Sequence, residues 1–421
     1  MRNKKVIVLV TLLSVLALAS CGTSDAGAPQ DSLNGREESA PENTRDNSLN
    51  LETSNRDASD KPLDSSFEYT VIEEENTVLL TNYIGDEEQV TVYGSYKIGG
   101  KEYKTRLQDG TIDNIMTSPF RDNTTITSIS FVGGVELDNC SNYFSYCTSL
   151  ETVDFSGLDT SGCTDFSAMF SNCTSLQALD LAPLNTDSLE ELYGMFSFCD
   201  SLTELDLSMI DTSRVTSFAY LFEHCVSLET VNLENINTSN AQDFISMFDG
   251  CFSLSSIDVS GFDTSNTTIM NAMFSGCSNL TNLDVSNFDT RQVMYMYGMF
   301  GGCSSLTSLD LSNFDTQQVE NMSAMFSGCS NLTSIDLDSF DTHRVGDMSE
   351  MFKGCSSLEQ LDISHFTPYN YLTHIYSMFE DCEQLAVVYV NQDFYDHVYS
   401  DRVQNSRDLF EDSLLTDFTV K

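Results

Sequence analysis

Residues 303–328 read CSSLTSLDLSNFDTQQVENMSAMFSG, and this 26-residue unit recurs along most of the chain. Nine cysteines follow one another at that spacing and a tenth comes one residue late: Cys147, Cys173, Cys199, Cys225, Cys251, Cys277, Cys303, Cys329, Cys355 and Cys382. A period of roughly 20–50 residues is typical of a solenoid, because one unit cannot bury its own apolar face without stacked neighbours.

Two apolar patterns occur inside the unit. Leu306, Leu309 and Leu311 bracket an alternating run, which predicts a short strand. A second set has the three- and four-residue spacing of one face of a short helix, and consists of Val319, Met322, Met325 and Phe326. We therefore predict an α/β solenoid of 26-residue leucine-rich repeats, with a parallel sheet on one face and short helices on the other.

Between the two patterns lies an Asp-Thr pair whose side-chain oxygens suit a helix cap or a turn. The aspartate recurs as Asp159, Asp211, Asp263, Asp289, Asp315 and Asp341, with Asn185 and Asn237 in its place in two units. Because both residue types accept a hydrogen bond from the backbone in the same way, their interchange predicts a structural role.

The first 20 residues have the order of a lipoprotein signal peptide. Basic residues precede an apolar run at positions 6–19, which is shorter than the ~20 residues of a membrane-spanning helix. The run ends in Leu-Ala-Ser-Cys, which resembles a bacterial lipobox and makes Cys21 the expected lipidation site, carrying acyl chains such as palmitate. We expect a protein anchored by lipid on the extracellular face of the cell membrane or on the outer membrane.

The rest of the chain divides by composition. Residues 21–66 have almost no large apolar side chains and predict a disordered tether. Residues 67–146 predict a β-rich N-terminal cap with a degenerate first repeat, and Gly99-Gly100 is placed for a hairpin turn. The solenoid follows at 147–382, and residues 383–421 predict a C-terminal cap with one strand at 385–390. The cap strands are expected at 67–72, 78–83, 90–93 and 102–107.

The repeat Cys-x-Ser-Leu-x-x-Leu-Asp-Leu-Ser-x-Phe-Asp-Thr-Ser-x-Val-x-x-Met-x-x-Met-Phe resembles the BspA-like leucine-rich-repeat surface proteins of bacteria. The resemblance covers residues 67–421. It implies a surface-displayed binding or adhesion protein, in some members for host matrix proteins. The family shares no catalytic residues, so none is carried over.

An acidic file is the candidate ligand surface. When the leucines of a strand point inward, the aspartate between them points outward, here from the expected concave face. The file consists of Asp154, Asp180, Asp206, Asp258, Asp284, Asp310, Asp336 and Asp362, with Asn232 in one unit. Carboxylates ~4.8 Å apart repel, and divalent cations such as Ca²⁺, a basic partner, the neighbouring serines or water and salt could offset this. A solvated face with raised pKa values and a ligand-binding face are both open.

The cysteine ladder also leaves two interpretations. Each ladder cysteine occupies the same place in its unit, where a small buried apolar residue fits, and this favours free thiols. Stacked neighbours are close enough for disulfides, so that alternative stays open. The CxxC pairs and nearby histidines of metal sites are missing from the sequence, and no metal or cofactor is predicted.

Charge and motifs narrow the function. The net charge of −45 repels phosphate backbones, so nucleic acid is not an expected partner. The sequence has no HExxH, phosphate loop or nucleophile elbow, so we predict no enzyme and a monomer that binds extracellular proteins. The alternatives are glycan capture through Ser, Asp, Tyr295 and Tyr297, and a cryptic hydrolase. Salt should weaken protein binding by the acidic file and barely affect glycan binding.

Overall fold

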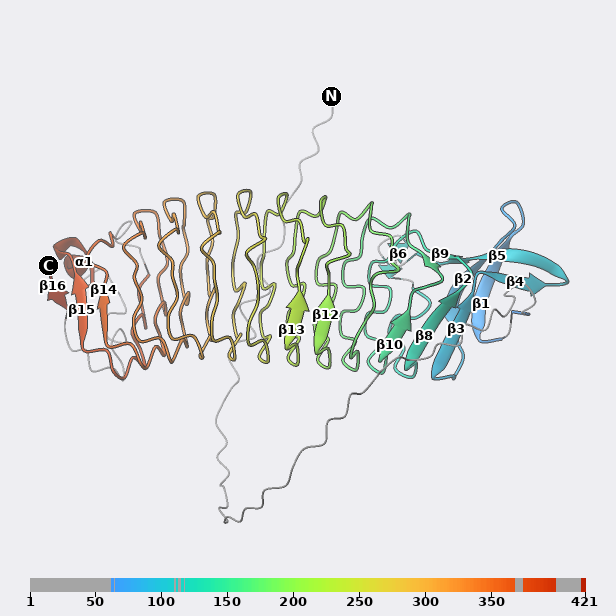
Figure 1. Ribbon diagram of the computed structural model, residues 1–421, viewed down its shortest axis with the longest axis horizontal. Coiled ribbons are helices and arrows are strands. Elements are labelled where there is room, and N and C mark those ends of the chain that lie inside the picture. The colour runs from blue at the N-terminus through green and yellow to red at the C-terminus, as the bar shows by residue number, and fades with distance from the viewer. Residues whose placement is uncertain are drawn as a thin grey trace, which may run out of the picture. The chain divides into compact units, whose positions relative to one another are not determined.

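The computed structural model describes residues 62–109 except 64, and residues 111–112, 115–116, 118–367, 374–398 and 418–421. These residues belong to one compact unit, in which successive coils of the chain stack as a parallel β-solenoid (Figure 1). The predicted solenoid is therefore confirmed. The predicted signal peptide, Cys21 and nearly all of the predicted tether lie outside the described residues.

Short parallel strands form one side of the coils, which we call the strand ladder. Strand β3 pairs with β8 and β8 with β10, β12 pairs with β13, and β14 pairs with β15, which pairs with β16. Their bounds are β3 Gln89–Tyr93, β8 Ser128–Val132, β10 Thr152–Asp154, β12 Glu204–Asp206, β13 Thr230–Asn232, β14 Gln360–Asp362, β15 Val387–Val390 and β16 Thr419–Val420. The parallel sheet was expected, although its strands are shorter and more interrupted than the repeat suggests.

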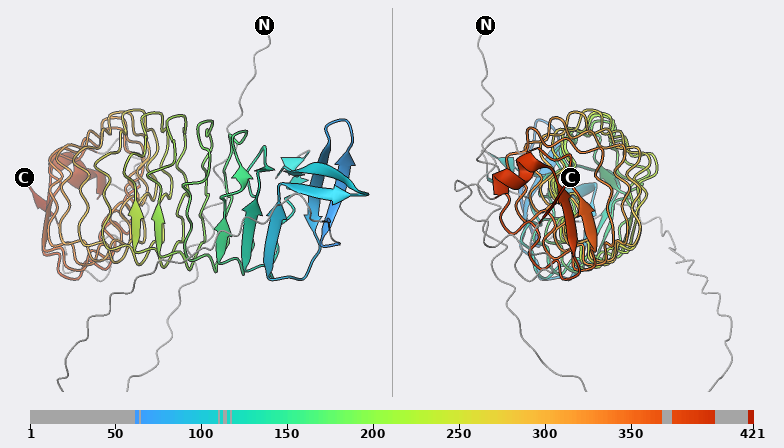
Figure 2. Two further views of the ribbon diagram at one scale, coloured as in Figure 1. Left: turned by 45° about the vertical axis from the view of Figure 1, so that its right-hand side comes forward. Right: turned by 90° about the vertical axis from the view of Figure 1, so that its left-hand side faces the viewer.

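The predicted helices are wrong. In the described residues the only α-helix is α1 (Gln392–Val398), beyond the last coil (Figure 2). The segment from Met322 to Gly328 instead places every second N–H against the next coil, with donor–acceptor distances of 2.6–2.9 Å to the carbonyl oxygens of residues 347, 349, 351 and 353. Two of the N–H groups between them close tight turns within the segment, Met325 onto Met322 and Ser327 onto Ala324. The third, that of Ser323, donates to the side chain of Asn321. We call this second side of the coil the turn ladder.

A left-handed residue at two places in each segment explains why no helix forms. Ala324 has a φ of 54° and Gly328 a φ of 75°, and the same two places have positive φ in the other coils. A right-handed helix has no such residue in its interior. The three- and four-residue apolar spacing is met equally well by consecutive turns, and turns leave the remaining N–H groups free to join neighbouring coils. A helix this short would also be marginal by itself.

The interior is one continuous apolar column. A phenylalanine from each coil stacks on the equivalent ring of the next coil, from Phe144 through Phe170 to Phe379. Ring centroids along this column are 5.3–6.1 Å apart, and the interplanar angles are 2–15°. The repeat leucines and methionines pack around the column and are buried with it.

The ladder cysteines are free thiols buried in this interior, as favoured from the sequence. Each donates its S–H to the carbonyl oxygen of a phenylalanine in the preceding coil; Cys303, for example, bonds to Phe274 at 3.1 Å. Because every ladder sulfur has such a partner, the thiols serve as small apolar residues that also satisfy one backbone carbonyl.

A buried threonine ladder is a feature that the sequence reasoning missed. The hydroxyl of Thr290 donates to the carbonyl oxygen of Asp315 (2.9 Å) and accepts from the N–H of the same residue (2.8 Å) in the next coil. Equivalent threonines repeat this arrangement at Thr160, Thr212, Thr238, Thr264, Thr316 and Thr342. The hydroxyl thus joins two coils where no backbone-to-backbone bond does.

The N-terminal cap has the four expected strands and several additional short ones. β1 (Phe67–Ile72) pairs antiparallel with β2 (Thr77–Tyr83), and β2 pairs parallel with β5 (Lys101–Leu107). The additional strand β4 (Ser95–Ile98) forms a hairpin with β5 through Gly99 and Gly100, both at positive φ, so the predicted turn is confirmed. The remaining short strands are β6 Thr111–Ile112, β7 Ile115–Met116, β9 Val135–Glu136 and β11 Leu158–Asp159.

Candidate interaction surface

All eight aspartates of the acidic file lie at the end of the strand ladder, in the same place in each coil. They are exposed, apart from the half-buried Asp362. In each, Oδ1 accepts the backbone N–H of the residue two positions later, at 2.8–3.0 Å. Asn232 accepts the same bond from Glu234 at 3.0 Å. One oxygen of each carboxylate therefore holds a turn.

These bonds set the charge of the file. Hydrogen bonds from the side chain and backbone of Ser286 lower the pKa of Asp284, and they outweigh repulsion from Asp310 and Asp258. The pKa values of Asp206, Asp258 and Asp310 are lowered in the same way by the serine that follows each of them. The expectation of raised pKa values is thus wrong for these residues, because local donors dominate repulsion across exposed, water-filled space.

Most of the file has no cationic partner within the described residues. Asp362 pairs with Lys421, and although burial raises its pKa, bonds from Lys421 and Ser364 bring it down to about 2. The amide of Asn232 donates to Asp206 at 3.0 Å. The other file carboxylates make no ion pair with any residue that the structure describes. The file therefore presents a row of exposed carboxylates, one from each coil, most of which have no ion-pair partner among the residues that the structure describes.

The second aspartate set has the structural role that its interchange with asparagine predicts. Asp263 accepts the N–H of Ser265 at 3.0 Å, and Asn237 accepts that of Ser239 at the same distance. The pKa of Asp263 is lowered by these contacts with Ser265. These residues hold the turns that lead into the buried threonines, although the turns precede no helix.

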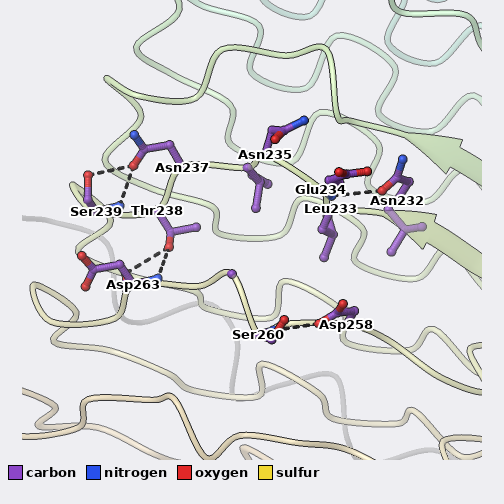
Figure 3. A pocket seen from close by; sticks show the side chains of 13 residues that line it. Asn232, Leu233, Glu234, Asn235, Asn237, Thr238, Ser239, Asp258, Ser260 and Asp263 are labelled. Atoms are coloured by element: carbon purple, nitrogen blue, oxygen red, sulfur yellow. Dashed lines mark hydrogen bonds between the residues drawn. The ribbon is translucent and has the colours of Figure 1, made fainter.

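A hollow of about 820 Å³ interrupts the surface beside Asp258, between turn 232–239 and turn 258–263 (Figure 3). Its cause is Gly261. In the next coil Asn287 occupies the matching position, and its amide donates to the carbonyl oxygens of Val259, Ser260 and Phe262 at 2.9–3.3 Å. A Cβ at Gly261 would meet no atom within 4 Å, so the space that asparagine fills elsewhere is open.

Gly261→Asn is expected to close the hollow and to stabilise the protein by about 1 kcal/mol. The new amide can reach the carbonyl oxygens of Leu233 and Ile236, and losing a glycine reduces the entropy of the unfolded chain. Urea denaturation measures the change. Asn287→Gly is the matched reverse substitution and should lower stability by a similar amount; a destabilising Gly261→Asn would show that the two positions are not equivalent.

A second polar cluster lies on the turn ladder. Tyr193 and Tyr220 pack with ring centroids 5.0 Å apart, and Ser217 donates to Asp243 at 3.0 Å. Desolvation raises the pKa values of Asp243 and Glu223. Sequence reasoning missed this cluster, because its members occupy positions that vary from coil to coil.

Asp243→Asn is expected to raise the melting temperature at pH 7.5. A carboxyl with a raised folded-state pKa is destabilised when ionised, so stability rises as pH falls through that pKa. The amide keeps an oxygen acceptor for Ser217 and removes the charge. The gain should therefore shrink at pH 4, and thermal unfolding at the two pH values measures it. An equal gain at both would mean that Asp243 carries no such penalty.

The tyrosines proposed for glycan contact do not lie beside the acidic file. Tyr295 and Tyr297, proposed for glycan contact, belong to the turn ladder and not to the file of Asp284 and Asp310. Within the described ranges, no three His, Cys, Asp or Glu residues are grouped as a metal site. None of the helices in the same ranges has the length and apolarity to cross a bilayer.

The chain matches one family model along most of its length. Residues 138–257, 225–309, 244–336 and 302–418 match the family described as "Mycoplasma protein of unknown function, DUF285". These stretches together cover 138–418, well over half of the chain. The chain belongs to this family. The description of the DUF285 family names no activity, and no curated protein matches the sequence.

Several solved structures are similar to this DUF285 member. A leucine-rich cell surface protein from Faecalibacterium prausnitzii is 19% identical, with a TM-score of 0.41 over 77% of this chain and 93% of that one. A leucine-rich-repeat protein from Bacteroides ovatus is 16% identical, with a TM-score of 0.39 over 85% and 99%. The leucine-rich-repeat protein of T. pallidum is 18% identical, with a TM-score of 0.34 over 58% and 91%.

Proposed function

We propose that this protein is a lipid-anchored, non-catalytic surface protein that binds a basic region of an extracellular protein through its acidic file. The observation that carries the proposal is the state of the file carboxylates. Hydrogen bonds from the serine two positions later lower the pKa values of four file aspartates, so these groups stay ionised at neutral pH while one oxygen of each remains available; the four are Asp206, Asp258, Asp284 and Asp310. A regular row of fixed charge complements a basic surface and steers its approach.

The sequence supports the surface location. The basic start, the apolar run and the Leu-Ala-Ser-Cys ending favour acylation of Cys21, and the repeat resembles that of BspA-like surface proteins. Cys21→Ser should abolish incorporation of labelled palmitate and release the protein from the membrane fraction. Retention of label by that variant would show that Cys21 is not the lipidation site.

Binding by the file is tested with charge-neutral substitutions that keep the fold. Asn232 makes the same turn bond as the file aspartates, so Asp284→Asn and Asp310→Asn should leave stability nearly unchanged. A reversal to lysine would remove the turn acceptor as well as the charge. The double variant should bind an arginine-rich peptide about 2- to 20-fold more weakly, from the modest energy of exposed charge pairs.

The control is Asp211→Asn with Asp315→Asn, which removes the same charge from the second aspartate set. Calorimetric titration at two salt concentrations, with a glutamine-substituted peptide alongside, separates file binding from general attraction. Equal weakening by both double variants would move the site away from the file.

Glycan capture is the second candidate, and the hollow favours it. Its walls carry Asn232, Asn237, Ser239 and Ser260, whose amides and hydroxyls match sugar hydroxyls. A glycan array decides between the two: a salt-insensitive glycan hit abolished by Gly261→Asn would replace protein binding as the proposed function.

A further inference from the structure

Two buried cysteines stand outside the 26-residue ladder. Cys140 follows β9 and Cys163 follows β11, one coil later, and neither side chain is exposed. Twelve cysteines lie among the described residues, all of them free thiols in the structure, and without these two the remaining ten are the ladder cysteines. No repeat requirement explains the pair, since the other coils have no cysteine at these positions.

The surroundings of the pair differ from those of the ladder. The sulfur atoms of Cys140 and Cys163 are 2.6 Å apart, closer than the roughly 3.5–4.0 Å of heavy atoms in non-bonded contact. Each ladder sulfur lies 3.0–3.2 Å from a carbonyl oxygen of the preceding coil. Cys163 makes a similar contact with the carbonyl oxygen of Leu137 at 3.2 Å, so the sulfur-to-sulfur contact is what sets the pair apart. Among the hydrogen bonds of the described residues, only the one at this pair joins two sulfur atoms.

We propose that Cys140 and Cys163 form an intramolecular disulfide in the exported protein, while the ten ladder cysteines remain thiols. The two thiols lose two protons and two electrons, and an exchanging disulfide, such as that of an oxidoreductase or oxidised glutathione, is reduced to two thiols. One thiolate attacks that disulfide and releases the first thiol. The second thiolate then attacks the protein sulfur of the mixed disulfide, which forms the Cys140–Cys163 bond and releases the other thiol.

Burial determines when this reaction happens. Desolvation raises the pKa of the Cys140 thiol well above its usual range, and no reagent reaches it in the folded protein. Oxidation therefore occurs during folding, before the coils close. The bond then ties the first coil to the second near the N-terminal end of the stack, where a repeat array needs its cap held in place.

Peptide mapping tests the pairing directly. The full chain is exported to an oxidising compartment, denatured with an alkylating agent and without reductant, digested and analysed by mass spectrometry. We expect one cross-linked peptide pair holding Cys140 and Cys163, two hydrogen masses lighter than the separate peptides, and alkylated ladder cysteines. Alkylation of both residues of the pair, or cross-links among ladder cysteines, would overturn the proposal.

A stability measurement provides the second readout. Reductant should lower the melting temperature of the natural protein by about 5 °C, because it removes a cross-link from the unfolded chain. Cys163→Ala should show no response to reductant, whereas the ladder variant Cys277→Ala should respond like the natural protein. An equal response of all three proteins, or none in the natural protein, would contradict the disulfide.

Discussion

Phe300→Ala is expected to lower the free energy of unfolding by about 3–5 kcal/mol. The Phe300 ring is fully buried and stacks on Phe274 at 6.1 Å and on Phe326 at 5.9 Å. Alanine removes the ring from the middle of the column and leaves a cavity that the rigidly spaced coils cannot collapse to fill. Urea denaturation followed by circular dichroism measures the loss.

The matched control is Phe300→Leu, which keeps most of the apolar volume and should lose far less stability. Because each coil is stabilised only by the coils beside it, the loss of stability at residue 300 should pass from coil to coil along the stack. The unfolding transition of the alanine variant should therefore be broader. A loss below about 1 kcal/mol for the alanine variant would show that the column is not the continuous core described here.

Thr290→Val is the second large effect, expected to lower the free energy of unfolding by about 2–5 kcal/mol. Valine has the shape of threonine but cannot bond to Asp315, so that residue's N–H and carbonyl both lose their buried partner. Each unsatisfied buried group costs about 1–3 kcal/mol. Chemical denaturation measures the change in the free energy of unfolding. This change should exceed that caused by replacing any exposed serine in the same coil.

Thr290→Ser separates the hydroxyl from the methyl group. Serine keeps the bonds to the next coil and loses one methyl, so a loss of about 1 kcal/mol is expected. If valine were tolerated as well as serine, the hydroxyl would not be joining the coils.

The repeat period predicts the stacking, yet it cannot predict how each coil is built. Val319, Met322, Met325 and Phe326 satisfy a helical spacing and a run of tight turns equally well. The choice is made by neighbours distant in sequence, which accept the N–H groups of Met322 and Ala324. Glycine before most of the later ladder cysteines is the local signal for the left-handed positions, and it could have counted against a helix.

At the candidate site, too, the sequence pattern predicts one feature and leaves another to the folded structure. Alternation around Leu309 and Leu311 predicts that Asp310 points outward, and the structure places it there. The charge state depends on the N–H of Ser312, whose position follows from the turn and not from the alternation. The sequence contains a signal for the hollow, because Gly261 stands where the equivalent positions 287 and 313 have asparagine. That an asparagine fills the space at this position is known only from the hydrogen bonds that Asn287 and Asn313 make in the structure.

Deleting one whole repeat tests most directly whether the coils are equivalent units stacked on a shared interior. Removal of residues 278–303 joins Cys277 to Ser304 and leaves every ladder partner in register. The shortened protein should fold cooperatively, keep its circular dichroism per residue and lose about 4.8 Å in length by X-ray scattering. Deletion of only 13 residues from the same place should unfold the region, because the strand residues of one coil would then stack on the turn residues of the next. An unfolded 26-residue deletion, or a folded 13-residue deletion, would contradict the stacked-coil structure.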